Sequence, residues 1–191
     1  MDRFAKLEKN ICDVIREDQI KLGYRSETMR LYYPLKSLNH LVGKELDIPE
    51  MYGELEDFCE EVEPRLGQIV ISSKGERFCL TFPPQTAEYV HARMPKDEFL
   101  EEFISVMERH GSTLEDVLAV FQRYSERIHL EKMEHEEFDY LIYFADGKPN
   151  DYRYCLTAED CHMIYHRFTP EDYEEFGFSA GTVVPWMERK S

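Results

Sequence analysis

The hydrophobic positions near the N-terminus repeat at the spacing of an α-helix. They are Phe4, Leu7, Ile11, Val14, Ile15 and Leu22. Because this spacing places them on one helical face, we predict a helix that ends at Gly23. A second helical stretch is expected over 26–43, kinked or restarted at Pro34, and a third from about Pro49 to Pro64.

The hydrophobic period changes to two after residue 67. Ile69 and Ile71 form one alternating run, and Phe78, Leu80 and Phe82 form another. The turn-forming residues 72–75 lie between the two runs, so a β-hairpin is predicted. Further along, helices are expected after residue 85, over 96–110 and over 114–125; strands over 128–133, 138–145 and 152–156; and short helices after Thr157 and Thr169.

This order of elements indicates the α+β class. We expect a single domain over 1–191, with a helical N-terminal part (1–66), hairpin and helix units (67–178) and a C-terminal tail (179–191). The strands should form one mainly antiparallel sheet of about four or five strands, built from two hairpin-helix units, with the N-terminal helices beside it.

Part of the chain is repeated. RFCLT at 77–81 matches RYCLT at 153–157, and TAEYVH at 86–91 matches TAEDCH at 157–162. With two gaps, the similarity extends over 77–103 and 153–176. An internal duplication and a chance match both explain it, and a repeated packing unit is a simpler interpretation than a repeated active site.

The tetrapeptide Thr-x-Glu-Asp occurs three times, at 113–116, 157–160 and 169–172. A threonine hydroxyl can accept a hydrogen bond from a free amide of the first helical turn, and acidic side chains there oppose the positive end of the helix dipole. We therefore interpret all three as helix N-terminal caps rather than as catalytic carboxylates.

The segment SETMRLYYPLKSLNHLVG at 26–43, together with the helix before it, resembles the start of an uncharacterised bacterial domain family. The resemblance covers most of the chain. It implies no activity and assigns no functional residue.

The composition narrows the classes of function. Twenty-three basic and thirty-nine acidic residues give a formal charge of −16, which disfavours nucleic-acid binding and favours a basic protein as partner. The hydrophobic runs are too short to cross a bilayer. The first ten residues show no signal-peptide pattern, and five cysteines cannot all pair, so a reducing cytoplasm is expected.

Common catalytic signatures are absent from the sequence. It contains no phosphate-binding loop of the type GxxxxGK[ST], no GxGxxG turn, no GxSxG nucleophile motif and no HExxH zinc motif. These absences predict no cofactor, and they identify no catalytic residue.

The best metal candidates are His162 and His166. At i and i+4 they would project from one side of the helix expected after Thr157, with Cys161, Cys155 or Glu159 as further donors. On such a helix Cys161 would face the core and the two histidines its flank. A pair of surface histidines is therefore the alternative to a metal site.

Two other groups have weaker claims. The repeat aligns Cys79 with Cys155 and His91 with His162, which suggests a cysteine nucleophile activated by a histidine. The alternative is that each cysteine only fills space in the core, as a buried cysteine in a strand often does. His129 and His135 flank a run of glutamates that is either a solvated strand face or an acidic edge for a partner. The glutamates are Glu131, Glu134, Glu136 and Glu137.

The tail contains hydrophobic residues that either pack on the domain's own core or anchor another protein. They are Val183, Val184, Trp186 and Met187. Taken together, the sequence favours a cytoplasmic, acidic, non-enzymatic binding protein. A metal-dependent hydrolase that uses His162 and His166 is the alternative.

Overall fold

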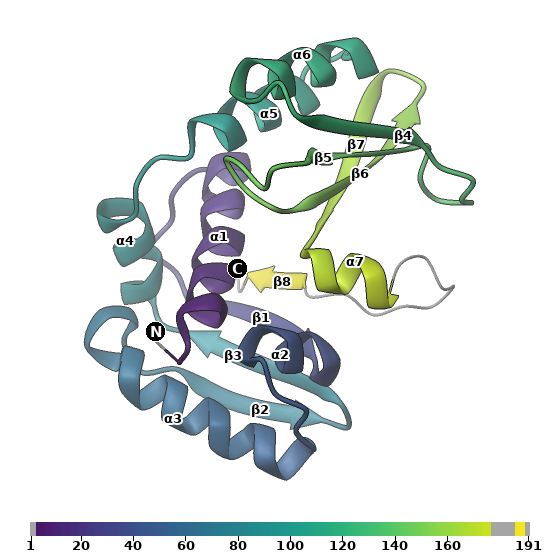
Figure 1. The fold of residues 1–191 in the computed structure, drawn as a ribbon. Helices are drawn as coiled ribbons and strands as arrows, with labels where there is room; N and C mark the ends of the chain where they lie inside the picture. The colour runs from purple at the N-terminus through teal and green to yellow at the C-terminus, as the bar shows by residue number, and fades with distance from the viewer. Residues whose placement is uncertain (1–2, 177–185, 190–191) are drawn as a thin grey trace. The chain divides into compact units, whose positions relative to one another are not determined.

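The computed structural model describes residues 3–176 and 186–189 and shows an α+β fold with two antiparallel sheets (Figure 1). The described residues group into two compact units. Unit 1 comprises 3–95 and 186–189, and unit 2 comprises 96–176. The α+β class is confirmed. Whether the two units fold as the single domain expected from the sequence stays a prediction.

Unit 1 is a four-stranded sheet with helices on one face. Its strands lie in the order β2-β3-β1-β8. Its elements are α1 (Ala5–Leu22), β1 (Met29–Pro34), α2 (Leu35–Val42), α3 (Ile48–Leu66), β2 (Val70–Lys74), β3 (Arg77–Phe82), α4 (Pro84–Arg93) and β8 (Trp186–Arg189). Alternate residues of β1 and β3, such as Leu31 and Leu80, are buried in one core with the apolar stripes of the helices. The intervening residues, such as Arg30 and Thr81, form the opposite sheet face.

Unit 2 is a four-stranded meander in the order β4-β5-β6-β7, with helices on both faces. Its elements are α5 (Glu98–Met107), α6 (Leu114–Tyr124), β4 (Ile128–Lys132), β5 (Tyr140–Phe144), β6 (Arg153–Glu159), β7 (His162–Phe168) and α7 (Pro170–Phe176). Phe99 and Phe103 of α5 pack edge-to-face against Tyr154 on one side of this sheet, at 5.9 and 5.0 Å between ring centroids. On the other side Tyr173 of α7 packs against the cluster of Leu141 and Cys155.

The strands form two sheets rather than the one that the sequence suggested. The reason lies in β1, which was expected to be helical. Leu31 and Tyr33 are buried while Arg30 and Tyr32 are half-buried, so this segment has the period of a strand and pairs with β3. Pro34 ends the strand, and the helix begins directly after it at Leu35. The sheet of unit 1 therefore includes β1 and contains no strand of unit 2.

The segment after Thr157 is the second correction, because it forms a β-hairpin and not a helix. β6 continues to Glu159 and β7 begins at His162, with the turn between them. The carbonyl of Cys161 in this turn accepts a hydrogen bond from the amide of Gly111, at 2.6 Å. The corner between α5 and α6 therefore holds the tip of the hairpin.

Two of the three Thr-x-Glu-Asp segments are confirmed as caps. Thr113 and Asp116 form a reciprocal capping box at α6, and the hydroxyl of Thr169 accepts from the amide of Asp172 at 3.1 Å. Thr157 instead lies within β6, where its hydroxyl donates to the carbonyl of Glu137.

The duplication is not confirmed. RFCLT lies in β3 and RYCLT in β6, but TAEYVH then forms α4 whereas TAEDCH ends a strand and makes a turn. In the tail, Val183 and Val184 lie outside the described residues. The backbone of Trp186 and Met187 belongs to β8, which pairs antiparallel with β1.

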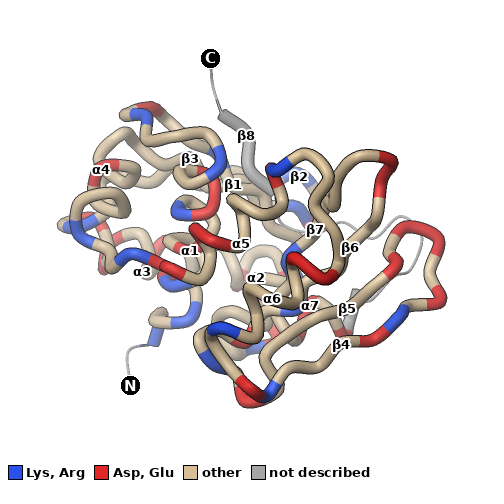
Figure 2. The backbone as a smooth tube through the Cα atoms, turned by 90° about the horizontal axis from the view of Figure 1, so that it is seen from above, with Lys and Arg blue, Asp and Glu red and all other residues tan. Residues whose placement is uncertain are grey.

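Acidic and basic residues are interspersed along both units (Figure 2). None of the helices within 3–176 is long and apolar enough to cross a membrane.

Candidate functional site

The two histidines of the metal hypothesis lie on strand β7. An extended strand rises about 3.3 Å per residue, so His162 and His166 are separated by about 13 Å along it, against about 6 Å on a helix. The helical spacing that motivated the hypothesis is therefore absent. His162 is 46% exposed, and its Nε2 lies 3.6 Å from a carboxylate oxygen of the half-exposed Glu159.

The cysteines lack the environment of a nucleophile. Cys155 is fully buried, and burial raises the pKa of its thiol to about 12, so it stays protonated at neutral pH. His166 is its register partner on β7. In unit 1, Cys79 lies on the outer face of β3, with its sulfur 3.9 Å from the hydroxyl of Thr81, and His91 stacks on Tyr24.

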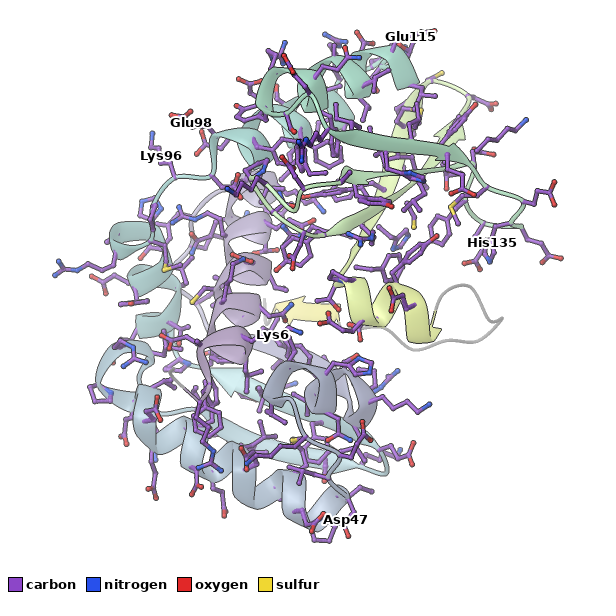
Figure 3. The ribbon with its side chains drawn as sticks, in the orientation of Figure 1. Lys6, Asp47, Lys96, Glu98, Glu115 and His135 are labelled. Carbon is purple, nitrogen blue, oxygen red and sulfur yellow. The ribbon has the colours of Figure 1, made fainter. Side chains whose placement is uncertain are left out.

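Three histidines of unit 2 pack against aromatic rings. His129 stacks on Tyr143 at 4.7 Å between ring centroids, and His135, in the loop between β4 and β5, stacks on Phe138 at 5.4 Å (Figure 3). His166 meets the edge of the same Phe138 ring at 5.4 Å. Across 3–176 and 186–189, no three His, Cys, Asp or Glu side chains come together in a way that could hold a metal ion.

The glutamates near these histidines, interpreted from sequence as either a solvated strand face or an acidic edge for a partner, are exposed. Glu131 is on β4, with the nitrogen of His129 at 3.1 Å, and the others follow in the connection to β5. The others are Glu134, Glu136 and Glu137. They line none of the cavities described below.

A more defined acidic feature lies in unit 1, between helix α3 and strand β2. We call it the α3–β2 groove; its volume is about 640 Å³. Its lining residues come from one stripe of the helix and from the chain that returns beside it: Tyr52, Glu56, Cys59, Glu60, Glu63, Gln68, Ile69, Val70 and Ile71.

Local sequence determines how the groove forms. Asp47 and Glu50 make a reciprocal capping box that starts α3, with Asp47 visible at the start of the helix (Figure 3). The neighbouring stripe of the helix is buried in the unit 1 core. That stripe consists of Met51, Leu55, Phe58, Val62 and Leu66. The polar stripe with Glu56 and Glu60 must therefore face outward, along the groove.

Gly67 turns the chain from the helix into the strand. Its φ is +79°, and a Cβ built there would lie 2.8 Å from the Cγ of Pro83 and 2.9 Å from the amide oxygen of Gln85. Only glycine fits this corner without displacement. The hydroxyl of Tyr52 then donates to the carbonyl of Ile71, at 2.9 Å, which ties the strand to the helix at one end of the groove.

The carboxylates of the groove are not paired with cations among the described residues. Within the described part of the chain, Glu56, Glu60 and Glu63 form no ion pair, whereas Glu54 and Glu8 of the same unit each accept hydrogen bonds from arginine. Carboxylates spaced i and i+4 on a helix repel one another, at a cost of about 0.2–0.5 kcal/mol. The groove therefore carries uncompensated negative charge.

The thiol in the groove is not a reactive one. Burial raises the pKa of Cys59 to about 12, and the neighbouring charge of Glu56 acts in the same direction. The remaining lining groups are carboxylates, an amide, a phenol and aliphatic side chains. This set can recognise a cation but includes no activated nucleophile.

The other wall of the groove is an open sheet edge. β2 is the outermost strand of its sheet, beyond β3. Val70 is 59% exposed there, which is unusual for a large aliphatic side chain in a strand. An edge strand offers backbone donors and acceptors to another strand.

Sequence reasoning missed this site, although part of its signal was present. The sequence places five groove residues on one helical stripe: Tyr52, Glu56, Cys59, Glu60 and Glu63. A stripe rich in glutamate is, however, typical of a helix face that is exposed to solvent. Only the return of β2 along the helix makes the stripe one wall of a groove.

Comparison with known protein families gives a match over most of the chain. Residues 4–177 match the family model described as "Domain of unknown function, E. rectale Gene description (DUF3877)". No curated protein and no solved structure matches the chain. Because the family model spans most of the sequence, in agreement with the resemblance noted over 26–43, the chain belongs to this family of uncharacterised domains.

Proposed function

We propose that this protein is a cytoplasmic, non-enzymatic binding protein that holds a basic, extended segment of a partner protein in the α3–β2 groove. The observation that supports it is the set of three glutamates that form no ion pair in the described part of the chain, beside an open edge strand. A negative patch attracts a positive partner and steers its encounter.

The spacing of the carboxylates suits an added strand. Glu56 and Glu60 are four residues apart on α3, about 6 Å along the helix axis. Alternate residues of a strand are about 6.6 Å apart and point to the same side. A peptide that adds to β2 with Lys or Arg at every second position would therefore present one cation to each glutamate.

The edge strand supplies the second part of the recognition. Strand addition takes its affinity from main-chain hydrogen bonds and its specificity from pockets for alternate side chains. Val70 would contact the apolar side of such a peptide, while Tyr52 marks the end of the groove, because its hydroxyl already engages the carbonyl of Ile71.

The alternative function, a metal-dependent hydrolase at His162 and His166, gains no support from the site. Their extended spacing on β7 and the protonated thiol of Cys155 both weigh against it.

The test is a fluorescence anisotropy titration with a labelled peptide that alternates lysine and valine. A peptide of the same composition with its lysines in one block is the comparison. We expect tighter binding of the alternating peptide and weaker binding as salt rises.

The variant Glu56→Lys/Glu60→Lys should weaken this binding at least about tenfold, since it replaces two attractions by two repulsions. The matched control is Glu45→Lys/Glu88→Lys, which changes the net charge equally at two exposed positions of unit 1 outside the groove. Circular dichroism verifies that both fold. Equal losses in both variants, or equal binding of both peptides, would overturn the proposal.

A further inference from the structure

The outer face of the unit 1 sheet carries a second cavity, of opposite charge. We call it the basic sheet face; its volume is about 590 Å³. Its lining residues come from three neighbouring strands: Arg30, Tyr32, Val70, Ser72, Ser73, Lys74, Arg77, Cys79 and Thr81. Three of these nine are cations and none is acidic, in a chain whose formal charge is −16.

The register of the sheet explains why these side chains meet. Residues of one face alternate along each strand, and Cys79 of β3 lies between its register partners Tyr32 of β1 and Ser72 of β2. Arg77 and Lys74 are direct partners in the next row of the same face. The helices of unit 1 pack on the opposite face.

The pair of Lys74 and Arg77 is the strongest feature of this cavity. Like charges directly opposite one another on antiparallel strands destabilise a sheet. Within 3–176 and 186–189, neither side chain forms an ion pair or a hydrogen bond. The nearest acidic residue along the chain, Glu76, is exposed in the turn and does not line the cavity. An anion bound between the two cations would relieve their repulsion.

Hydroxyl groups surround the cations. Tyr32, Ser72 and Thr81 of this face can each donate one hydrogen bond, and the guanidinium of Arg77 can donate two in parallel. A phosphate group presents several strong acceptor oxygens and a charge near −2, and Arg and Lys are the side chains that most often bind it. Arg30 lies at the far end of the cavity, where Glu188 of β8 is its register partner, so the argument depends on Lys74 and Arg77.

From this geometry we propose that the basic sheet face binds a small phosphorylated ligand, held by Lys74 and Arg77 and oriented by the surrounding hydroxyl groups. The cavity volume lies in the range of small-molecule sites, about 300–1,000 Å³. A long polyanion is a poorer fit, because the net charge of −16 on the chain would repel its other phosphates. This site meets the α3–β2 groove at Val70, which lines both, but Lys74 and Arg77 do not line the groove, and neither proposal depends on the other.

The test is a titration of the full chain with inorganic pyrophosphate at low salt, followed by the backbone amide signals in ¹H–¹⁵N NMR spectra. Sodium chloride at equal ionic strength is the comparison. We expect saturable shifts confined to β2, β3 and the Arg30 end of β1, with a Kd below about 10 mM. Shifts that do not saturate, or that arise elsewhere, would overturn the proposal.

The variant Lys74→Gln/Arg77→Gln should weaken pyrophosphate binding at least about tenfold. The control is Arg93→Gln, at an exposed position of α4 in the same unit. It should change the Kd for pyrophosphate by less than about twofold. Equal loss in the two variants would contradict the assignment. Tighter binding of a single-stranded oligonucleotide than of pyrophosphate would contradict a small ligand.

Discussion

The carboxylate of Glu54 offers a sharp test of the electrostatics of unit 1, because it contrasts with the glutamates of the groove on the same helix. Its side chain is only 7% exposed, and it accepts hydrogen bonds from Nε of Arg3 at 2.9 Å and from Nζ of Lys44 at 2.7 Å. These contacts lower the pKa of Glu54 below its ordinary value of 4.5, with the hydrogen bonds from Arg3 as the largest cause.

The substitution Glu54→Gln keeps the shape and removes the charge. Each charge-assisted hydrogen bond contributes about 1.5–3 kcal/mol. The two cations are 46% and 41% exposed, so water recovers much of this once the carboxylate is gone. We therefore expect a net loss of about 2 kcal/mol in the free energy of unfolding at pH 7.

The loss should depend on pH in a defined direction. A carboxyl whose pKa is lowered by folding stabilises the protein above its unfolded pKa, and this stabilisation disappears as the pH falls through the folded pKa. The difference between the wild-type protein and Glu54→Gln should therefore shrink below about pH 4. Urea denaturation followed by circular dichroism at several pH values measures it.

The control is Glu56→Gln, two residues further along α3, where no described cation is paired with the carboxylate. It should change the unfolding free energy by less than about 0.5 kcal/mol. A loss for Glu54→Gln that is the same at pH 7 and pH 3.5, within about 0.5 kcal/mol, would mean that packing and not charge explains it. An unchanged free energy of unfolding for Glu54→Gln at pH 7 would refute the stabilising ion pairs of Glu54 with Arg3 and Lys44.

Three further predictions concern unit 2 and the cysteines. Phe103→Ala should lower the free energy of unfolding, measured by urea denaturation, by about 3–5 kcal/mol, since this ring is fully buried among other rings. A decrease below about 1 kcal/mol would contradict that packing. Thr169→Ala should cost about 1 kcal/mol through loss of the α7 cap, and Thr169→Ser should restore most of it; equal losses in both would point away from the hydroxyl. With Ellman's reagent at pH 8, the exposed Cys161 should react quickly, whereas Cys12 and Cys155, whose pKa values burial raises to about 12, should react only after unfolding; early reaction of either buried thiol would be inconsistent with the fold.

The elements with one clear period could be predicted from sequence. Helix α1, the β2–β3 hairpin and the helices α5 and α6 agree with their hydrophobic spacing to within a few residues. These segments have an apolar stripe on one side only, and a glycine, a capping threonine or a capping aspartate marks at least one end of each.

The two misread segments are short and fit both periods. In the segment after Thr157, Cys161, Ile164 and Phe168 fit a helical stripe, yet Met163 and Tyr165 alternate equally well on a strand. The capping tetrapeptide favoured the helix. Tertiary contacts stabilise a strand here instead, because β7 pairs with β6 and the amide of Gly111 donates a hydrogen bond to the carbonyl of Cys161 in the turn. Local sequence does not contain those contacts.

The two proposed sites could be predicted only in part. The sequence shows which charged residues lie on each helix or strand, but not which other element packs beside it. The acidic stripe of α3 and the cations at Lys74 and Arg77 can be read in the sequence. The sequence does not show that β2 runs beside α3. It also does not show that the outward-facing residues of β2 lie next to those of β3 and β1 in one sheet. One edge strand thus borders an acidic groove and a basic face.

The most direct test of the central proposal is amide hydrogen exchange of the full chain, with and without the peptide that alternates lysine and valine. If the peptide adds to β2, exchange over residues 68–74 should slow, because its edge amides become hydrogen-bonded. The β4 edge of the other sheet, residues 128–132, serves as the internal control and should exchange at an unchanged rate. Equal protection at both edges, or none over 68–74, would contradict binding of a basic strand in the α3–β2 groove.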